Sequence, residues 1–178
     1  MPEQDDPIYV IDANCMIGLE DCHDRIPGRV VNPIFQPAQR KKVWRGLRDL
    51  SQRGRLKIIT EVRSEVALRC PNATALIKRC LERTGSRKNR AIMLDYQRII
   101  RNYPKWAPGE STQIDSADPW IIATALVRNY VVVTDELPAF AQTKMPSRNR
   151  PKIPDVCARE QLVCQVGLKQ LARQHGWI

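Results

Sequence analysis

The sequence predicts an α/β protein in three layers, with helices on both faces of a central parallel sheet. Short β-branched runs alternate along the chain with longer segments whose apolar residues recur at helical spacing. Strands separated by helices pair in parallel, and such sheets are buried on both faces. The 178 residues are enough for one hydrophobic core, so we expect a single domain over residues 1–178.

The first half of the chain begins with two predicted strands and two predicted helices. Residues 8–11 form a β-branched run that ends at an aspartate, which indicates a buried strand. Residues 37–53 have apolar side chains at helical spacing, proline near the start and glycine just after the end, as is typical of a helix. A second strand is expected at 56–59, followed by a helix to about residue 70 that Thr60 can cap.

The middle of the chain is predicted to be mainly helical. Two helical segments are expected at about 73–84 and 88–102, before a proline-rich loop at 104–113. We therefore interpret the region from about 70 to 113 as a helical insertion or clamp within the single domain.

The second half repeats the alternation of helix and strand. A helix is expected over 115–129, with Pro119 at a first-turn position where its missing N–H costs nothing. The remaining elements, in order, are a strand at 130–133, a loop rich in proline and basic residues at 138–152, a short strand near 162–165 and a helix at 168–174.

The charge of the chain favours a polyanionic partner. Lysine and arginine number 29 against 19 acidic residues, a net charge of +10, and nucleic acid is the first candidate. The basic residues concentrate in two stretches, which are equally compatible with solvated helix faces: Arg40, Lys41, Lys42, Arg45, Arg48, Arg53, Arg55 and Lys57, then Lys78, Arg79, Arg83, Arg87, Lys88, Arg90, Arg98 and Arg101.

Two further observations exclude other classes of protein. The six cysteines form no Cys-x-x-Cys pair, so we expect free thiols and no structural zinc site. The chain has no apolar run of membrane-spanning length and no signal-like start, so we expect no membrane partner and a cytoplasmic location.

Acidic residues from distant parts of the chain fall where predicted strands end or helices begin. Asp12 follows the first strand, Asp118 begins a helix, Asp135 and Glu136 come just after the 130–133 strand, and Glu65 lies one turn into the helix after the second strand. In a parallel sheet these positions share the carboxyl edge. Converging carboxylates need a compensating cation, and hard oxygen ligands suit Mg²⁺ or Mn²⁺. The sequence therefore predicts a metal site suited to phosphodiester hydrolysis.

Each acid also has a purely structural interpretation. Asp118 before a proline is a good N-cap, and Asp12 at a strand end could form an Asx-turn. Glu65 could be an exposed helix charge paired with a neighbouring arginine, at 63 or 69. Asp115 could equally be the helix cap or an acid that supports the metal ligands. Each acid alone has such an explanation, whereas several acids at the ends of different elements point to a shared site.

Four runs of sequence resemble the motifs of PIN-domain nucleases. Tyr-Val-Ile-Asp12-Ala-Asn14, Asp118-Pro-Trp-Ile-Ile-Ala-Thr-Ala-Leu and Val-Val-Val-Thr134-Asp135-Glu136 resemble the first, third and fourth motifs, and Thr-Glu61-Val-Arg-Ser-Glu65 is similar to the second. The resemblance spans residues 8 to about 165. The run Lys152-Ile-Pro-Asp155-Val-Cys157 looks like a feature of a PIN-like subgroup of bacteria and archaea, found beside toxins of toxin–antitoxin pairs.

The resemblance implies a Mg²⁺- or Mn²⁺-dependent endoribonuclease. The metal ligands would be Asp12, Glu65, Asp118 and an acid at 135 or 136, with Asn14 as a polar neighbour. It also implies RNA as substrate, a homodimer and, if the protein is a toxin, a small protein antitoxin as partner. The chain departs from the family pattern at Ala13 and Pro119, where threonine or serine and alanine are common. The family spacing favours Glu136 over Asp135, and both stay open.

The same residues argue against two other functions and leave one alternative open. The chain has no Gly-x-Gly-x-x-Gly run after the first strand and no Gly-Lys-Ser/Thr loop, which argues against nucleotide binding. Asp12-Ala13-Asn14 lacks the second aspartate of an aspartyl-phosphate phosphatase. The main alternative is a non-catalytic RNA-binding or protein-interaction module that keeps the PIN-like fold, because phosphate contacts need only basic side chains.

Overall fold

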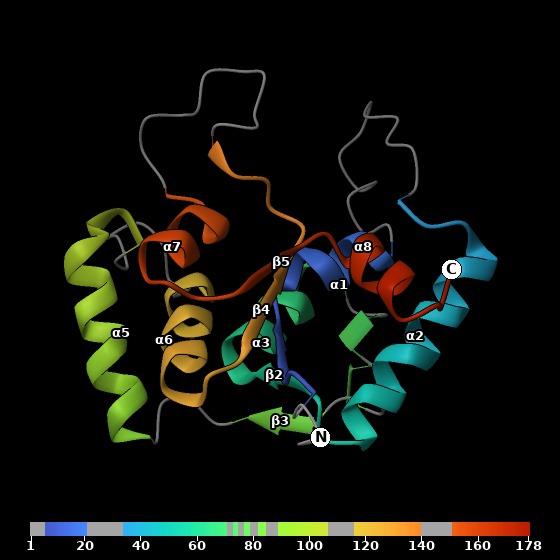
Figure 1. Cartoon of the computed structure of the whole chain (residues 1–178), viewed down its shortest axis with the longest axis horizontal. Coiled ribbons are helices and arrows are strands. Elements are labelled where there is room, and N and C mark those ends of the chain that lie inside the picture. The colour runs from blue at the N-terminus through green and yellow to red at the C-terminus, as the bar shows by residue number, and fades with distance from the viewer. Residues whose placement is uncertain are drawn as a thin grey trace, which may run out of the picture.

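A parallel sheet of five strands forms the centre of the protein (Figure 1). The structure is a computed structural model, which describes residues 6–20, 34–70, 73–74, 77–78, 82–84, 89–106, 116–139 and 151–178. The strand order is β3-β2-β1-β4-β5, and every neighbouring pair is parallel. The strands are β1 (Tyr9–Ile11), β2 (Leu56–Ile59), β3 (Glu82–Thr84), β4 (Val131–Thr134) and β5 (Cys164–Val166). All five therefore end at the same edge.

Helices cover both faces of this sheet, which confirms the predicted three-layer α/β/α class. The helices are α1 (Ala13–Leu19), α2 (Pro37–Gln52), α3 (Thr60–Arg69), α5 (Arg90–Asn102), the 3₁₀ helix η2 (Pro104–Trp106), α6 (Asp118–Arg128), α7 (Ile153–Arg159) and α8 (Leu168–Gln174). In Figure 1, α5, α6 and α7 lie on one side of the strands and α1, α2 and α8 on the other. Helix α3 follows β2 and contacts α1.

The core centres on the two middle strands and on α6. All three residues of β1 are buried, as are three of the four in β4. Helix α6 is buried from Pro119 to Ala125, because it lies between the sheet and α5. Tyr96 of α5 stacks on Trp120 of α6 with ring centroids 3.8 Å apart. The described part of the region predicted as an insertion or clamp thus contributes the edge strand β3 and an outer helix, α5, that packs on α6.

Elements with a clear apolar period were predicted correctly. Strand β2 and helix α8 have the predicted bounds, and β1, α2 and α6 lie within the predicted ranges. Gly54 has a φ of +71° just after α2, a left-handed conformation that glycine adopts without steric cost. Thr60 was wrongly predicted as a cap: it is the first helical residue of α3, and Ile59 stands at the N-cap.

Four short elements were missed: β3, α1, α7 and the 3₁₀ helix η2, which begins where a loop was expected. The predicted helix at 73–84 is wrong at its end, because residues 82–84 form the edge strand β3 beside β2. Helices α1 and α7, of seven residues each, were not predicted. The expected loops at 104–113 and 138–152 lie largely outside the described residues.

The structure bears on two further expectations, those about membrane-spanning helices and about the cysteines. None of the helices in the described ranges is long and apolar enough to cross a membrane. Cys15, Cys157 and Cys164 are free, as predicted. Cys70 is disulfide-bonded, so the prediction of free thiols was wrong there.

Candidate active site

Asp12 is the buried centre of the candidate site. It follows β1 directly, and its N–H donates to the Val133 carbonyl of β4 at 2.9 Å. The residue is 1% exposed. Asp12 stands at the N-cap of α1, but its side chain makes no capping bond. Its Oδ2 instead accepts a hydrogen bond from Oγ1 of the buried Thr134, 2.9 Å away. The structure therefore does not bear out a capping or turn role for this carboxylate.

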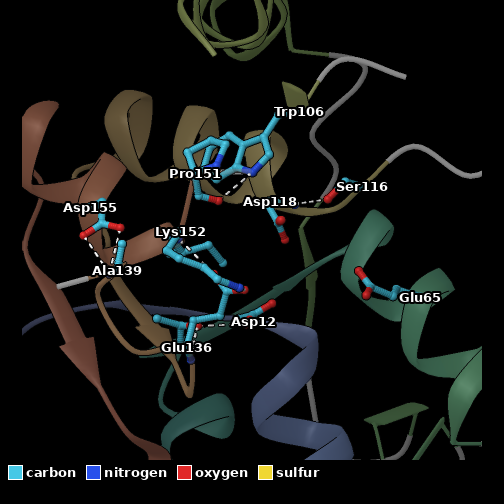
Figure 2. A network of polar contacts seen from close by, with 12 residues as sticks. Asp12, Glu65, Trp106, Ser116, Asp118, Glu136, Ala139, Pro151, Lys152 and Asp155 are labelled. Carbon is cyan, nitrogen blue, oxygen red and sulfur yellow. Dashed lines mark hydrogen bonds and ion pairs between the residues drawn. The ribbon is translucent and has the colours of Figure 1, made fainter. Parts of the chain in front are cut away.

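Three other carboxylates act on Asp12. Burial, followed by the charges of Asp118, Glu136 and Glu65, raises the pKa of Asp12 from its ordinary 3.8 to about 8, and the Thr134 hydrogen bond opposes part of this rise. Figure 2 shows these carboxylates around one space at the carboxyl edge of the sheet. The charges of acids from three other parts of the chain thus act on Asp12.

Asp118 has the strongest charge effect on Asp12. It is the first residue of α6, while Ala117 occupies the N-cap, and no side chain caps the helix from that position. The interpretation of Asp118 as the cap is therefore wrong. The Asp118 N–H donates to Oγ of Ser116 at 3.4 Å, and the Asp118 side chain points toward Asp12 (Figure 2). Pro119 lies in the first turn, as predicted.

Glu65 approaches the cluster from α3. Its side chain is 18% exposed and forms an ion pair with Arg69, with Oε1 and Nη2 3.1 Å apart. The alternative interpretation, an ion pair between Glu65 and Arg69 within one helix, is thus confirmed. Glu65 also has the weakest charge effect on Asp12 among the three acids. This residue therefore lies at the periphery of the cluster, across from Asp118 in Figure 2.

The two adjacent acids after β4 face different surroundings. Asp135 accepts the N–H of Leu168 at Oδ1, at 2.6 Å, where α8 begins. It also adds to the effect of burial in raising the pKa of the Cys15 thiol. Glu136 instead lies beside Asp12 and accepts from Lys152 and from the Ile153 N–H. Glu136 is therefore the better placed of the two as the fourth acid.

Of the supporting residues predicted from the sequence, Asn14 lies half-buried in the first turn of α1, two residues after Asp12. Asp115 lies outside the described residues. Sequence reasoning did not single out Thr134, which holds Asp12, or Lys152, which contacts Glu136 at 2.9 Å. Each of them lies in a run that resembles the PIN-domain family: Thr134 precedes the two adjacent acids, and Lys152 begins the run that ends at residue 157.

The donor set fits a hard divalent cation. All four side chains offer carboxylate oxygens, which Mg²⁺ and Mn²⁺ prefer, and the charges of the three other carboxylates all raise the pKa of Asp12. Within the described ranges, no three acidic, histidine or cysteine side chains surround one point closely enough to hold an ion. Mg²⁺ usually binds through one or two carboxylates and keeps several waters. Asp12 and Asp118 suit that mode of binding.

Comparison with known proteins places the chain without assigning an activity. Residues 9–177 match the family described as Domain of unknown function (DUF4411). No curated protein matches the chain.

Proposed function

The chain belongs to the DUF4411 family, and from the chemistry of its site we propose that it is a Mg²⁺- or Mn²⁺-dependent ribonuclease. One observation carries the proposal: Asp12, a carboxylate 1% exposed, has three further carboxylates acting on it at the edge where the parallel strands end. Buried charges of one sign are costly, and they are retained where a cation offsets them.

In this proposal Asp12 and Asp118 supply the oxygen ligands, and Thr134 fixes the orientation of Asp12. A divalent ion, when bound, would activate a water and neutralise charge on the phosphate. The raised pKa of Asp12 means that its carboxyl holds a proton at neutral pH when no cation is present. Asp12 would hold a cation in its deprotonated form, so binding of the cation would require loss of that proton.

Positive side chains outside the cluster support RNA as the substrate. Lys41, Lys42, Arg45 and Arg48 are all exposed on α2, and the chain carries a net charge of +10. Lysine and arginine bind phosphates independently of sequence, with an affinity that falls as salt rises. A charge-reversed Arg45→Glu/Arg48→Glu protein should bind single-stranded RNA more weakly and with a shallower dependence on salt. Unchanged binding would remove α2 from the proposed RNA surface.

A cleavage assay tests the proposal directly. Wild type, Asp12→Asn and Asp118→Asn are compared on total RNA with Mn²⁺ or Mg²⁺, and with EDTA as the metal-free reference. Loss of either ligand should lower the cleavage rate by roughly a hundredfold or more, because even groups that only support a metal ligand matter 10–100-fold. Asp49→Asn, on the exposed side of α2, is the matched control and should cleave as wild type does. Equal cleavage by all four proteins would refute the proposal.

A second candidate is a non-catalytic RNA-binding module. The specific observation in its favour is that two of the four acids are already paired within the chain, Glu65 with Arg69 and Glu136 with Lys152. Wild type that binds RNA but neither binds Mn²⁺ nor cleaves RNA would identify this candidate as correct.

A further inference from the structure

Lys152 brings a positive charge from outside the sheet to the acid cluster. Its Nζ lies 2.9 Å from Oε1 of Glu136, and the two side chains are 33% and 16% exposed. Oε2 of Glu136 accepts the N–H of Ile153 at 2.9 Å. Lys152 and the first residue of α7 thus hold both oxygens of this acid, and Figure 2 shows Lys152 beside Glu136.

The backbone that carries Lys152 is fixed by contacts on both sides. The carbonyl of Pro151, immediately before it, accepts the indole N–H of the buried Trp106 at 3.1 Å. Asp155, within the first turn of α7, accepts the Ala139 N–H at both carboxylate oxygens, at 3.0 and 3.2 Å. These contacts hold the backbone of Lys152 beside Glu136, and because both side chains of the pair are partly buried, water and salt screen this ion pair less than an exposed one.

The pairing is also connected to Asp12. The Glu136 N–H donates to Oγ1 of Thr134 at 3.0 Å, and the same oxygen donates to Asp12 at 2.9 Å. The other ion pair of the cluster, between Glu65 and Arg69, involves an arginine side chain that is 58% exposed and belongs to a single helix. Exposed pairs of that kind contribute little. Lys152 is therefore the better-placed compensating charge of the two.

We propose that Lys152 is the resident counter-cation of the acid cluster: it neutralises Glu136 when no divalent ion is bound and weakens the binding of such an ion. The second half rests on the proposed function. A positive charge next to a carboxylate competes with a divalent ion for that ligand and repels the ion. Lys152 thus sets how tightly the cluster holds metal.

The first measurement uses no metal. In EDTA, Lys152→Gln should lower the melting temperature by about 2–4 °C, because it leaves Glu136 without its counter-charge. Adding Glu136→Gln in the same chain should restore most of that loss, since a neutral pair needs no counter-charge. Lys41→Gln removes the same charge from an exposed position on α2 and is the control. A Lys152→Gln protein that melts at the wild-type temperature overturns the first half of the proposal.

The second measurement is the dissociation constant for Mn²⁺, by titration calorimetry or electron paramagnetic resonance. Lys152→Gln should bind Mn²⁺ about tenfold more tightly than wild type, a gain of about 1.4 kcal/mol. Lys152→Arg and Lys41→Gln should bind as wild type does. If Lys152→Gln binds Mn²⁺ equally or more weakly, while wild type binds Mn²⁺ and cleaves RNA, the second half is overturned and the proposed function stands. A wild type that neither binds Mn²⁺ nor cleaves RNA overturns the proposed function and the effect of Lys152 on metal binding. The melting temperatures in EDTA then still test whether Lys152 neutralises Glu136.

Discussion

Replacing Asp12 by asparagine should remove a specific dependence of stability on pH. Asparagine has nearly the same shape and can still accept the Thr134 hydrogen bond, but it carries no charge. In the folded protein, burial and the neighbouring acids raise the pKa of Asp12 from its ordinary 3.8 to about 8. The folded chain therefore holds a proton, between about pH 4 and pH 8, that the unfolded chain has released.

The sign and size of the effect follow from this difference in proton binding. A group whose pKa is higher in the folded state contributes stability that is fully present below its unfolded pKa and is lost as pH rises through the folded pKa. With pKa values of 3.8 and about 8, the loss is about 1.4 kcal/mol per pH unit and reaches about 4 kcal/mol at pH 7. It levels off above about pH 8.

The assay is urea unfolding in EDTA at several pH values from 5 to 8.5. The stability of Asp12→Asn relative to wild type should increase with pH by up to about 4 kcal/mol over that range. Asp49→Asn, an exposed aspartate that pairs with Arg53 on α2, serves as control and should follow wild type. If the stabilities of Asp12→Asn and wild type change in parallel at every pH, the pKa of Asp12 is not raised in the folded protein.

Three further predictions concern other contacts. Gly46→Ala should destabilise the protein by about 1–3 kcal/mol in urea unfolding, because its new Cβ would lie 2.1 Å from the ring of Trp177. Unchanged stability would mean that the ring moves away at no cost. Trp106→Phe, which removes the indole N–H that fixes the segment before α7, should cost at least about 1 kcal/mol in the same assay, and a neutral result would contradict that role. Glu65→Gln should reduce Mn²⁺ affinity less than Asp118→Asn does, since its charge effect on the buried aspartate is weaker; the reverse order would place Glu65 inside the cluster.

The sequence by itself determined the layers and the edge at which the acids lie. Alternating apolar periods identified β1, β2, α2 and α8, because a buried strand or helix face must be apolar along its length. The positions of Asp12 and Asp118 at the ends of such elements were enough to place them at one edge, since parallel strands all end there.

Only the tertiary structure decided how the acids are used. Asp135 and Glu136 are adjacent in sequence, yet one receives an N–H of α8 and the other an ammonium and an N–H of α7. That choice depends on where two helices from later in the chain pack against the sheet, which no local pattern encodes. The same reason applies to Lys152, which reaches Glu136 across 16 residues of chain. Periodicity reports which side of an element is buried, whereas contacts between elements are set by packing.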